Sequence, residues 1–511
     1  MEKMQPIRES YLYLPIQAGK EERLIEIFCH EEAGANLKIM ECMIPIGEVA
    51  DGVYSYDYLA RFPVKQFTDK TLYLKGDVPE AFWKEVRNTS FLENEPMERP
   101  SIHFTAQTGW INDPNGLLYK DGVYHLYFQY NPFNTSWNNM CWGHAESLDL
   151  LHWTQKDTVL FPDEDGMMFS GSGIVNEKGL LQLPKEALLF FYTAAGGSNE
   201  WAKEKQFTQK IAYSLDNGET LMKTELGKIE AICKENRDPK VFWHEESKAY
   251  IMCLWLEAND FAILRSTDLE RFEITDQLTL EEAWECPDLM KVPTQNGQEQ
   301  WVFWTADGFY YFGDFDGYQF KTDGVRHHAY MNKLPYAAQS FHGTPDRVVS
   351  LSWIRTKQEG RLYTGAMGLP RELSVIEIDG KPYLSQKIVR EFHEAKKQIC
   401  SKVEHGSYII IVSNVTEINM QLNGSEKGIV AWNLCGTKVT YDSGAGLFQI
   451  GGDSYNVGAN IKDFSFVVDD TILEVTANRG IIVGVFELNR TLPYIQAKRD
   501  AFEEWESYTI Q

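Results

Sequence analysis

The sequence has no long apolar run. No stretch approaches the roughly 20 apolar residues that a membrane-spanning helix requires. Residues 1–20 contain no basic segment followed by an apolar one, which is the pattern of a secretory leader. From these two absences we expect no membrane partner and a cytoplasmic protein, with a non-standard export route left open.

The cysteines are few and lie far apart. Eight are spread over 511 residues without a Cys-x-x-Cys pair, so their spacing fits neither a zinc site nor a disulfide framework. The sequence also lacks a His/Cys/Asp cluster at metal-ligand spacing and a glycine-rich phosphate loop. We therefore expect reduced and mostly buried thiols, no bound metal and no cofactor.

Basic residues are outnumbered by acidic ones. The chain has 49 Lys and Arg against 74 Asp and Glu, a formal net charge of −25. A field of that sign repels nucleic acids and anionic membranes, so neither is expected as a partner. A neutral ligand is not repelled, and the composition therefore favours a neutral substrate.

Long helical patterns are also missing, and short strand patterns take their place. The hydrophobic content of 43% allows large cores, and 511 residues are too many for one of them. Strands rich in aromatic residues recur, with starts 47 to 64 residues apart, at 124–130, 188–193, 249–256, 301–305 and 348–353. Five all-β units of that size predict a five-bladed β-propeller. A single long β-sandwich is the alternative, but it gives no reason for the regular spacing.

We expect an all-β protein in three parts. Residues 1–97 hold short alternating strands and one short helix near 81–86, which predicts a small N-terminal β-rich module. Residues 98–390 hold the propeller units. A helical connector is expected at 389–397, and the strands after it predict a linker and a C-terminal β-sandwich for residues 391–511. Either the sandwich or the N-terminal module could join copies of the chain into an oligomer.

Three acids lie at a similar phase within successive propeller units. Asp113 and Asp238 each precede their aromatic strand by 11 residues, and Glu285 precedes its strand by 16. Because the first strand of each blade lines the central channel of a propeller, we expect the three carboxylates to converge at one mouth of that channel. Pro114 favours an extended backbone for Asp113, which would present this carboxylate at a bend.

Carboxylates that share a pocket do different work. Like charges raise one another's pKa, so that one group serves as a proton donor while others stay ionised. Glu285 lies between a tryptophan and a cysteine, and we expect this apolar setting to favour its neutral form. Asp113 lies among amides and Asp238 follows Arg237, and we expect both to be ionised. This is the arrangement of a retaining glycosidase, and the nearby tryptophans suit stacking on sugar rings.

Each motif also has a simpler interpretation. The bend at Asp113 could be an ordinary surface turn, and Arg237 with Asp238 could form a surface ion pair. Glu285 could be one more exposed acid in an acidic chain. Ser170 suits a turn better than a nucleophile, because no base is adjacent to it in the sequence. Taken one at a time, the motifs leave these alternatives open.

Taken together, the motifs resemble a known family. Seven occur in the family's order, namely Trp-Ile-Asn-Asp-Pro-Asn-Gly (110–116), Trp-Gly-His-Ala (142–145), Phe-Ser-Gly-Ser (169–172), Arg-Asp-Pro (237–239), Trp-Glu-Cys-Pro-Asp-Leu (284–289), Gly-Asp-Phe-Asp-Gly (313–317) and Leu-Pro-Arg-Glu-Leu (369–373). The series is similar to glycoside hydrolase family 32, which includes β-fructofuranosidases, levanases and inulinases. One departure is the segment 331–335, which stands where the family often has an acidic stretch.

The resemblance implies a five-bladed propeller with a C-terminal β-sandwich, and it implies roles for single residues. Asp113 matches the nucleophile that forms a fructosyl-enzyme, Glu285 the acid/base and Asp238 the transition-state stabiliser. Further matches shape the fructose pocket, namely Asn112, Gln129, Trp137, Phe169, Ser170, Arg237 and Trp353.

The implied activity is retaining hydrolysis that releases fructose. The implied substrate is a neutral fructose-containing saccharide such as levan, inulin, a fructo-oligosaccharide or sucrose. Two alternatives use the same residues: a fructosyltransferase with the same acids, and a non-catalytic fructan-binding propeller. An intact acid trio argues against the second, because a lectin needs no proton donor.

Overall fold

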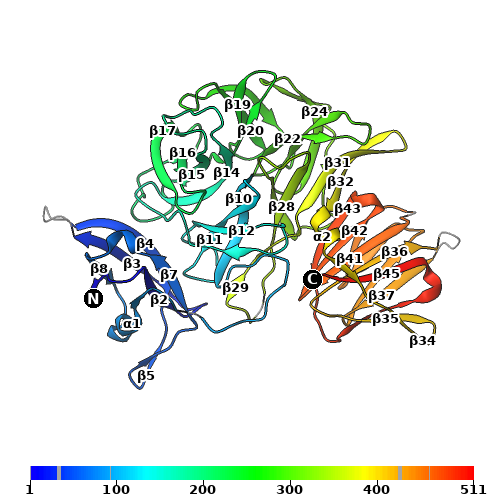
Figure 1. Cartoon of the computed structure of the whole chain (residues 1–511), viewed down its shortest axis with the longest axis horizontal. Helices are drawn as coiled ribbons and strands as arrows, with labels where there is room; N and C mark the ends of the chain where they lie inside the picture. Colours follow the sequence, from blue (N-terminus) through cyan, green and yellow to red (C-terminus); the bar gives the residue numbers. More distant parts are fainter. Residues whose placement is uncertain are drawn as a thin grey trace.

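The computed structural model describes residues 2–30, 36–92, 94–358, 360–423, 428–459 and 461–510. Strands make up 55% of the chain and helices 4%, so the expectation of an all-β protein is confirmed. Figure 1 shows the N-terminal strands in blue, a central body of sheets from cyan to yellow, and the C-terminal strands in orange and red. None of the helices in the described ranges combines the length and the apolar character that crossing a membrane requires.

The N-terminal strands form two small sheets around one core. The four-stranded sheet has the order β1–β8–β3–β4, the three-stranded sheet has the order β7–β2–β9, and β5 pairs with β6. The elements are β1 (Glu2–Pro6), β2 (Tyr11–Ile16), β3 (Glu22–His30), β4 (Asn36–Pro45), β5 (Val49–Ala50), β6 (Val53–Tyr54), β7 (Tyr58–Pro63), η1 (Lys65–Phe67), β8 (Thr71–Gly76), α1 (Glu80–Glu85) and β9 (Arg87–Thr89). Alternate residues of β3, namely Ile25, Ile27 and Cys29, lie in this core. The short helix expected near 81–86 is α1.

Five successive sheets follow in the described part of residues 109–388. The first two contain β10 (Gly109–Lys120), β11 (Val123–Asn131), β12 (Cys141–Ser147), β13 (Thr154–Gln155), β14 (Met167–Val175), β15 (Leu188–Ala195), β16 (Phe207–Ser214) and β17 (Met222–Ile229). The third and fourth contain β18 (Arg237–His244), β19 (Ala249–Trp255), β20 (Asp260–Ser266), β21 (Glu273–Thr279), β22 (Asp288–Pro293), β23 (Glu299–Trp304), β24 (Phe309–Phe315), β25 (Phe320–Thr322) and β26 (His327–His328). The last contains β27 (Pro335–Ser340), β28 (Val348–Ile354), β30 (Ala366–Met367), β31 (Arg371–Ile378) and β32 (Lys381–Ile388).

The second strand of each sheet is one of the aromatic-rich segments that the sequence singles out. These strands are β11, β15, β19, β23 and β28. Every residue of β15 and β19 is buried. A strand that is buried on both faces has no side exposed to solvent, so its residues do not alternate between apolar and polar. This explains the continuous apolar runs.

The innermost strands contact one another in a ring. Strand β14 touches β10 and β18, and β27 touches β22 and β10. Strands β18 and β22 are joined by Lys240, whose Nζ lies 3.3 Å from Asp288 Oδ2. The ring is closed by β29 (Tyr363–Thr364), which pairs in parallel with the start of β10 at Gly109 and Trp110. The β-propeller expected from the sequence is therefore confirmed.

The C-terminal strands form a sandwich of two sheets with the orders β33–β45–β36–β41–β42–β43 and β34–β35–β44–β37–β38–β39–β40. The elements are α2 (Arg390–Glu394), β33 (Lys396–Gln398), β34 (Lys402–Glu404), β35 (Ser407–Ile411), β36 (Val415–Leu422), β37 (Ile429–Leu434), β38 (Thr437–Asp442), β39 (Leu447–Ile450), β40 (Asp453–Asn456), β41 (Asp463–Asp469), β42 (Ile472–Ala477), η2 (Asn478–Gly480), β43 (Ile482–Glu487), β44 (Tyr494–Lys498), η3 (Arg499–Ala501) and β45 (Phe502–Ile510). Trp432, Tyr441, Phe464 and Phe466 pack edge to face in the core between the two sheets. The expected β-sandwich is confirmed, and α2 is the expected connector.

A buried charged network fastens the propeller to the sandwich. His103 Nδ1 lies 2.9 Å from Asp469 Oδ2, and His103 Nε2 lies 3.2 Å from Glu474 Oε1. Arg371 pairs with the other oxygen of Glu474. Burial alone would lower the pKa of His103, but the hydrogen bonds to Asp469 and Glu474 raise it to about 9. The imidazole is therefore a cation that holds two carboxylates of the sandwich.

Candidate active site

The three acids meet at one end of the ring of innermost strands. Asp113 lies on β10, Asp238 on β18, and Glu285 in the connection just before β22. Cys286 Sγ lies 3.7 Å from Asp113 Oδ2 and 3.5 Å from Asp238 Oδ2. The two aspartates therefore contact the same sulfur atom, in the residue next to Glu285. The structure brings together all three carboxylates that the sequence predicts.

Four of the innermost strands are bulged at the residues that carry this site. The register shifts between Ile111 and Pro114 on β10, between Phe169 and Gly171 on β14, between Arg237 and Lys240 on β18, and between Tyr336 and Gln339 on β27. A bulge leaves residues unpaired and re-aims their side chains. Asp113 and Asp238, which precede their aromatic strands by the same interval in the sequence, thus lie at equivalent bulges in their sheets.

The backbone is strained at the same place. Asp238, Glu285, Cys286 and Ala337 have φ values of 65°, 47°, 42° and 50°. Residues other than glycine seldom adopt such left-handed conformations, which cost of order 1–3 kcal/mol each when they lie in sparsely populated regions. Four of them around one group of carboxylates indicate a geometry that the surrounding fold maintains for function.

Asp113 is held by two polar neighbours. Ser170 Oγ donates a hydrogen bond to Asp113 Oδ2 at 2.6 Å, and the Asn112 side chain bonds to the same carboxyl group. Asn112 is held in turn by Trp110, whose Nε1 donates to Asn112 Oδ1 at 3.0 Å. Burial raises the pKa of Asp113 above its ordinary value, while the hydrogen bonds from Ser170 and Asn112 lower it. The net direction is upward.

Asp238 is more deeply buried than the sequence suggests. Its side chain accepts a hydrogen bond from the Cys286 N–H at 3.2 Å. Burial raises the pKa of Asp238 to about 7, the Arg237 charge opposes this, and the charges of Glu285 and Asp113 add to it. The expectation that both aspartates lie in settings that favour ionisation is wrong for the free site. For both aspartates, burial raises the pKa by more than the neighbouring polar and charged groups lower it.

Arg237 reaches Glu285. Its Nη2 donates to Glu285 Oε1 at 2.5 Å, and its guanidinium carbon lies 4.0 Å from the ring centre of Trp255. Tyr336 donates its hydroxyl to the other oxygen, Glu285 Oε2, at 2.7 Å. The expected apolar surroundings of Glu285 are therefore wrong. Trp284 packs on Trp255 with ring centres 5.1 Å apart and is 40% exposed.

Aromatic rings lie beside the residues that bond to the acids. Trp353 lies 5.8 Å from Trp110 and 6.2 Å from Tyr336, measured between ring centres. Trp137 lies 6.0 Å from Phe169, measured between ring centres, and is 50% exposed. Such rings offer flat apolar faces to a ligand.

Most of the predicted pocket residues thus lie around the acids. Gln129 differs from the other predicted residues. It is buried, and its Nε2 donates a hydrogen bond to the Met168 carbonyl at 2.9 Å. This bond fixes the strand that carries Phe169 and Ser170. Gln129 therefore supports the site indirectly, through its hydrogen bond to Met168.

Sequence reasoning missed three contributors, namely Cys286, Tyr336 and Gln339. Cys286 contacts both aspartates, Tyr336 bonds to Glu285, and Gln339 Nε2 donates to the Gly171 carbonyl at 3.1 Å. A signal was available for Tyr336 and Gln339. They flank the bulge of the fifth sheet, which precedes its aromatic strand by nearly the same interval as Asp113 and Asp238 precede theirs.

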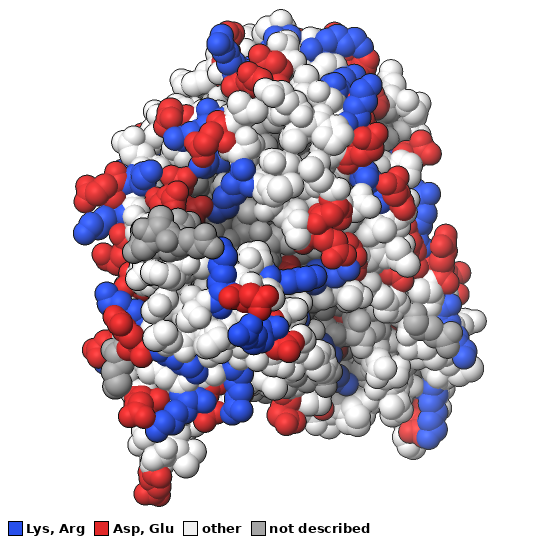
Figure 2. All heavy atoms as spheres, turned by 60° about the vertical axis from the view of Figure 1, so that its left-hand side comes forward, with Lys and Arg blue, Asp and Glu red and all other residues white. Residues whose placement is uncertain are grey.

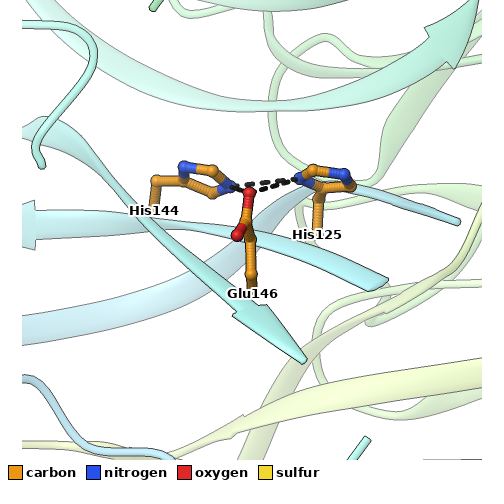
Figure 3. A group of neighbouring side chains, drawn as sticks. All are labelled: His125, His144 and Glu146. Atoms are coloured by element: carbon orange, nitrogen blue, oxygen red, sulfur yellow. Dashed lines mark hydrogen bonds and ion pairs between the residues drawn. The ribbon is translucent and has the colours of Figure 1, made fainter. Parts of the chain in front are cut away.

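One group of side chains in the described residues has ligand atoms close enough for a metal ion. Figure 3 shows His125, His144 and Glu146, from β11 and β12, pointing toward one another. His125 Nδ1 lies 3.2 Å from His144 Nε2 and 3.7 Å from Glu146 Oε1. However, Lys156 Nζ already pairs with Glu146 Oε2 at 3.0 Å, and the buried His144 Nδ1 has no hydrogen-bond partner.

A histidine that binds a metal almost always donates its other ring N–H to a partner. His144 has none for its Nδ1. Burial lowers the pKa of His125 to about 4, so this ring is neutral near neutral pH. The arrangement fits a hydrogen-bonded pair of neutral histidines better than a metal site.

The chain is similar in sequence to a family of known proteins. A family model described as "Glycosyl hydrolases family 32 N-terminal domain" matches residues 103–387, more than half of the chain. Levanase from Bacillus subtilis is 32% identical over 328 residues, which are 58% of this chain and 47% of the levanase. The extracellular exo-inulinase of Aspergillus awamori is 33% identical over 344 residues, which are 57% of this chain and 64% of the inulinase. The chain thus spans about half to two thirds of the length of these curated relatives.

Solved structures match more of the molecule. The exo-inulinase of Aspergillus awamori has a TM-score of 0.72 at 25% identity and covers 82% of this chain and 99% of its own. The fructofuranosidase of Schwanniomyces occidentalis, complexed with fructose, has a TM-score of 0.68 at 25% identity and covers 80% and 97%. A glycoside hydrolase family 32 protein from Bifidobacterium adolescentis covers 100% and 99% with a TM-score of 0.69, and its 18% identity shows the fold alone.

The comparisons contradict the expected cytoplasmic location. Several of the relatives are named extracellular exo-inulinases. The cysteines do not decide the question. Seven of the eight are fully or partly buried free thiols, and such thiols are compatible with either compartment. We therefore abandon the cytoplasmic assignment.

Proposed function

The chain belongs to glycosyl hydrolase family 32, and we propose that it is a retaining β-fructosidase that releases fructose from fructans, fructo-oligosaccharides or sucrose. The observation that carries the proposal is the meeting of three carboxyl groups around Cys286: Asp113 and Asp238 come from bulged strands, and Glu285 precedes Cys286 directly in the chain. Most glycosidases use two carboxyl groups that flank the glycosidic bond, and in retaining enzymes one of the two is the nucleophile. The names of the relatives, levanase and exo-inulinase, support the substrate class.

In the first proposed step, Asp113 attacks the anomeric carbon of the terminal fructosyl unit. Glu285 gives its proton to the glycosidic oxygen, the bond from that oxygen to the anomeric carbon breaks, and the remaining sugar leaves as an alcohol. An ester between fructose and Asp113 is formed. In the second step the Glu285 carboxylate takes a proton from water, the water oxygen attacks the anomeric carbon, and fructose leaves with Asp113 restored.

Asp238 takes the role of the transition-state stabiliser in this proposal. Its carboxyl group lies beside Asp113, across the sulfur of Cys286. Positive charge develops on the sugar ring in the transition state of glycoside cleavage. A carboxylate fixed near that ring, with fructose hydroxyl groups as hydrogen-bond partners, stabilises this charge without taking part in covalent chemistry.

The proposed substrate pocket fits a neutral saccharide. The apolar rings near the acids are Trp110, Trp353, Trp137 and Phe169. Asn112, Ser170 and Arg237 supply polar groups near them. The net charge of −25 would not hinder the approach of an uncharged sugar.

The test is the product profile on sucrose, inulin, levan and short fructo-oligosaccharides. We expect free fructose as the main product from dilute substrate, and we expect Asp113→Asn to abolish its release. Asp121→Asn is the matched control, because Asp121 is 79% exposed in the turn after the same strand. Sugars that grow by transfer from dilute sucrose would indicate a fructosyltransferase instead. Binding of fructan without release of any sugar would indicate a non-catalytic propeller.

A further inference from the structure

The hairpin β3–β4 of the N-terminal strands presents polar side chains to the propeller. One face of the hairpin packs in its own core through residues such as Ile25 and Cys42. The other face carries Glu22 and Leu24 on β3 and Glu41 on β4, and all three are buried or half-buried. Two loops of the propeller cover this second face.

The first of these loops carries Trp137, one of the proposed pocket residues. Glu22 binds it on both sides of the tryptophan. Asn134 Nδ2 donates to Glu22 Oε1 at 2.7 Å, and Asn138 Nδ2 donates to Glu22 Oε2 at 2.8 Å. A single carboxylate of the N-terminal strands thus fixes the segment that carries this exposed aromatic ring.

The neighbouring backbone and the second loop are fixed in the same way. The Asn139 side chain accepts from the Met43 N–H at 2.7 Å and donates to the Met43 carbonyl at 2.9 Å. In the loop between β15 and β16, the Trp201 N–H donates to Glu41 Oε1 at 2.9 Å. Lys38 Nζ lies 5.1 Å from the ring centre of Trp201. The hairpin therefore holds both loops in place.

An open pocket of about 310 Å³ lies between the hairpin and the two loops. This volume is at the lower end of the range for small-molecule sites. Its lining comes from the hairpin, from the Trp137 loop, from the start of β14 and from the loop between β15 and β16, and includes Leu24, Met43, Asn138, Met167, Glu200 and Lys203. Nothing assigned so far uses this pocket.

The pocket adjoins the proposed fructose site. Asn138 follows Trp137 directly in the chain, and both belong to the loop that Glu22 holds. Met167 packs in one small cluster with Trp110 and Phe169, which flank the acids. A saccharide that extends from the acids past Trp137 would therefore reach this pocket next.

The chemistry of the lining fits an uncharged polar ligand. Amide, hydroxyl and charged groups alternate with Leu24 and Met43. Glu200 and Lys203 are exposed, of opposite charge, and paired with no other described side chain. Figure 2, in which the N-terminal side comes forward, shows acidic and basic residues interspersed rather than one sign gathered on this face. Sugar hydroxyl groups both donate and accept, so they can use such mixed partners.

We propose that this pocket binds a further sugar unit of the substrate, on the leaving-group side of the bond that is cleaved. The inference rests on the proposed function, since it takes the terminal fructose to lie at Asp113. It makes the N-terminal hairpin part of the substrate-binding surface. The enzyme would then distinguish long chains from sucrose by contacts that sucrose is too short to make.

The test compares kcat/KM along a series of fructo-oligosaccharides that starts at sucrose. Leu24→Trp fills the pocket from β3, and we expect kcat/KM for sucrose to change less than twofold while that for longer chains falls about tenfold, mainly through KM. Lys203→Ala, an exposed change that spares the fold, should give a smaller loss of the same kind. Leu37→Trp is the matched control, because Leu37 is 53% exposed on the same hairpin and outside the pocket.

The outcomes separate the two proposals. A loss that grows with chain length in Leu24→Trp and Lys203→Ala, but not in Leu37→Trp, supports the pocket as a sugar subsite. Equal losses for sucrose and long chains, or no loss in either variant, would overturn this inference while leaving the β-fructosidase assignment intact. A wild-type enzyme that cleaves no fructoside would overturn the proposed function and this inference with it.

Discussion

Arg237 donates a hydrogen bond to Glu285 at 2.5 Å across the gap between the third and fourth sheets of the propeller. The sequence suggests a different partner for this arginine, the adjacent Asp238. In the structure the guanidinium of Arg237 binds Glu285, and the flat face of the guanidinium lies over the Trp255 ring. A single fixed cation thus lies among three carboxylates, and its position depends on two sheets rather than one.

We predict that Arg237→Ala lowers kcat/KM for sucrose by about 10²-fold, the typical cost of removing one preorganised group that faces the reacting centre. The reason is the loss of the cation that orients Glu285 and opposes the raised pKa of Asp238. Arg265→Ala is the control, because Arg265 also stacks on an aromatic ring, Tyr318, at 4.7 Å. It lies on β20, away from the acids. Steady-state kinetics that show equal activity in both variants would contradict the assigned role.

The acid/base role of Glu285 predicts a dependence on the leaving group. Glu285→Gln cannot donate a proton, and general acid catalysis contributes about 10²- to 10⁴-fold. We expect a loss in that range on sucrose and a much smaller loss on fructosyl fluoride, whose leaving group needs little protonation. Glu282→Gln, in the same connection but paired with Arg326 at the surface, is the control and should behave like the wild type. Equal losses of Glu285→Gln on both substrates would argue against the role.

Ser170 predicts a shift in the pH profile. Its hydroxyl donates to Asp113 Oδ2 at 2.6 Å and lowers the pKa of that carboxyl group, against the upward effect of burial. If Asp113 must be ionised to attack, activity is lost as the pH falls through its pKa. Ser170→Ala removes the bond, so the pKa rises and the acid limb of kcat/KM moves to higher pH.

The control for Ser170 lies two residues further along the same strand. Ser172 Oγ donates to the Pro239 carbonyl at 2.8 Å and does not touch Asp113. Ser172→Ala should leave the acid limb of the wild type in place, whatever it does to stability. The proposed effect of Ser170 on the pKa of Asp113 would be refuted if the acid limb of kcat/KM did not move in Ser170→Ala, or if it moved as far in Ser172→Ala.

Much of this fold could be predicted because its signals are local. The strands β11, β15, β19, β23 and β28 are rich in aromatic and apolar residues, and the nearly continuous apolar runs of β15 and β19 follow from burial on both faces. The acids Asp113 and Asp238 could be grouped because a propeller repeats its strands at a fixed phase. The three-part division of the chain at residues 97 and 390, by contrast, stays a prediction, as do the roles of the acids.

The partners of the acids could not be predicted, because they depend on register and on packing between sheets. A bulge between Arg237 and Lys240 is a matter of how β18 pairs with β19, and no residue type in the sequence fixes it. The bulge sends Asp238 inward and leaves Arg237 to cross to Glu285. Tyr336 meets Glu285 only because β27 and β22 are neighbours in the ring. Local composition therefore gave the wrong partners for Arg237 and Glu285, and the wrong direction for the pKa of Asp238.

The buried network at His103 predicts how stability depends on pH. His103 has a pKa raised from 6.5 to about 9, so its contribution is fully present below pH 6.5 and is lost as the pH rises through about 9. Glu474 has a pKa lowered from 4.5 to about 2, so its contribution is present above pH 4.5 and is lost as the pH falls through about 2. We expect the resistance of the propeller–sandwich junction to denaturant to be highest between these limits.

His103→Gln should remove the alkaline part of this dependence and destabilise the junction. Without the imidazolium, Asp469 loses a buried charged partner and Glu474 keeps Arg371 and the Leu369 N–H, and breaking such a buried pair typically costs about 3–5 kcal/mol. His152→Gln is the matched control, because His152 pairs with Asp149 at the surface, where its side chain is 55% exposed and such a pair is worth about 0–1 kcal/mol. Urea unfolding followed by tryptophan fluorescence at pH 6 and pH 9 measures both effects. A His103→Gln protein that stays as stable as His152→Gln at pH 6 would show that the network does not hold the two bodies together.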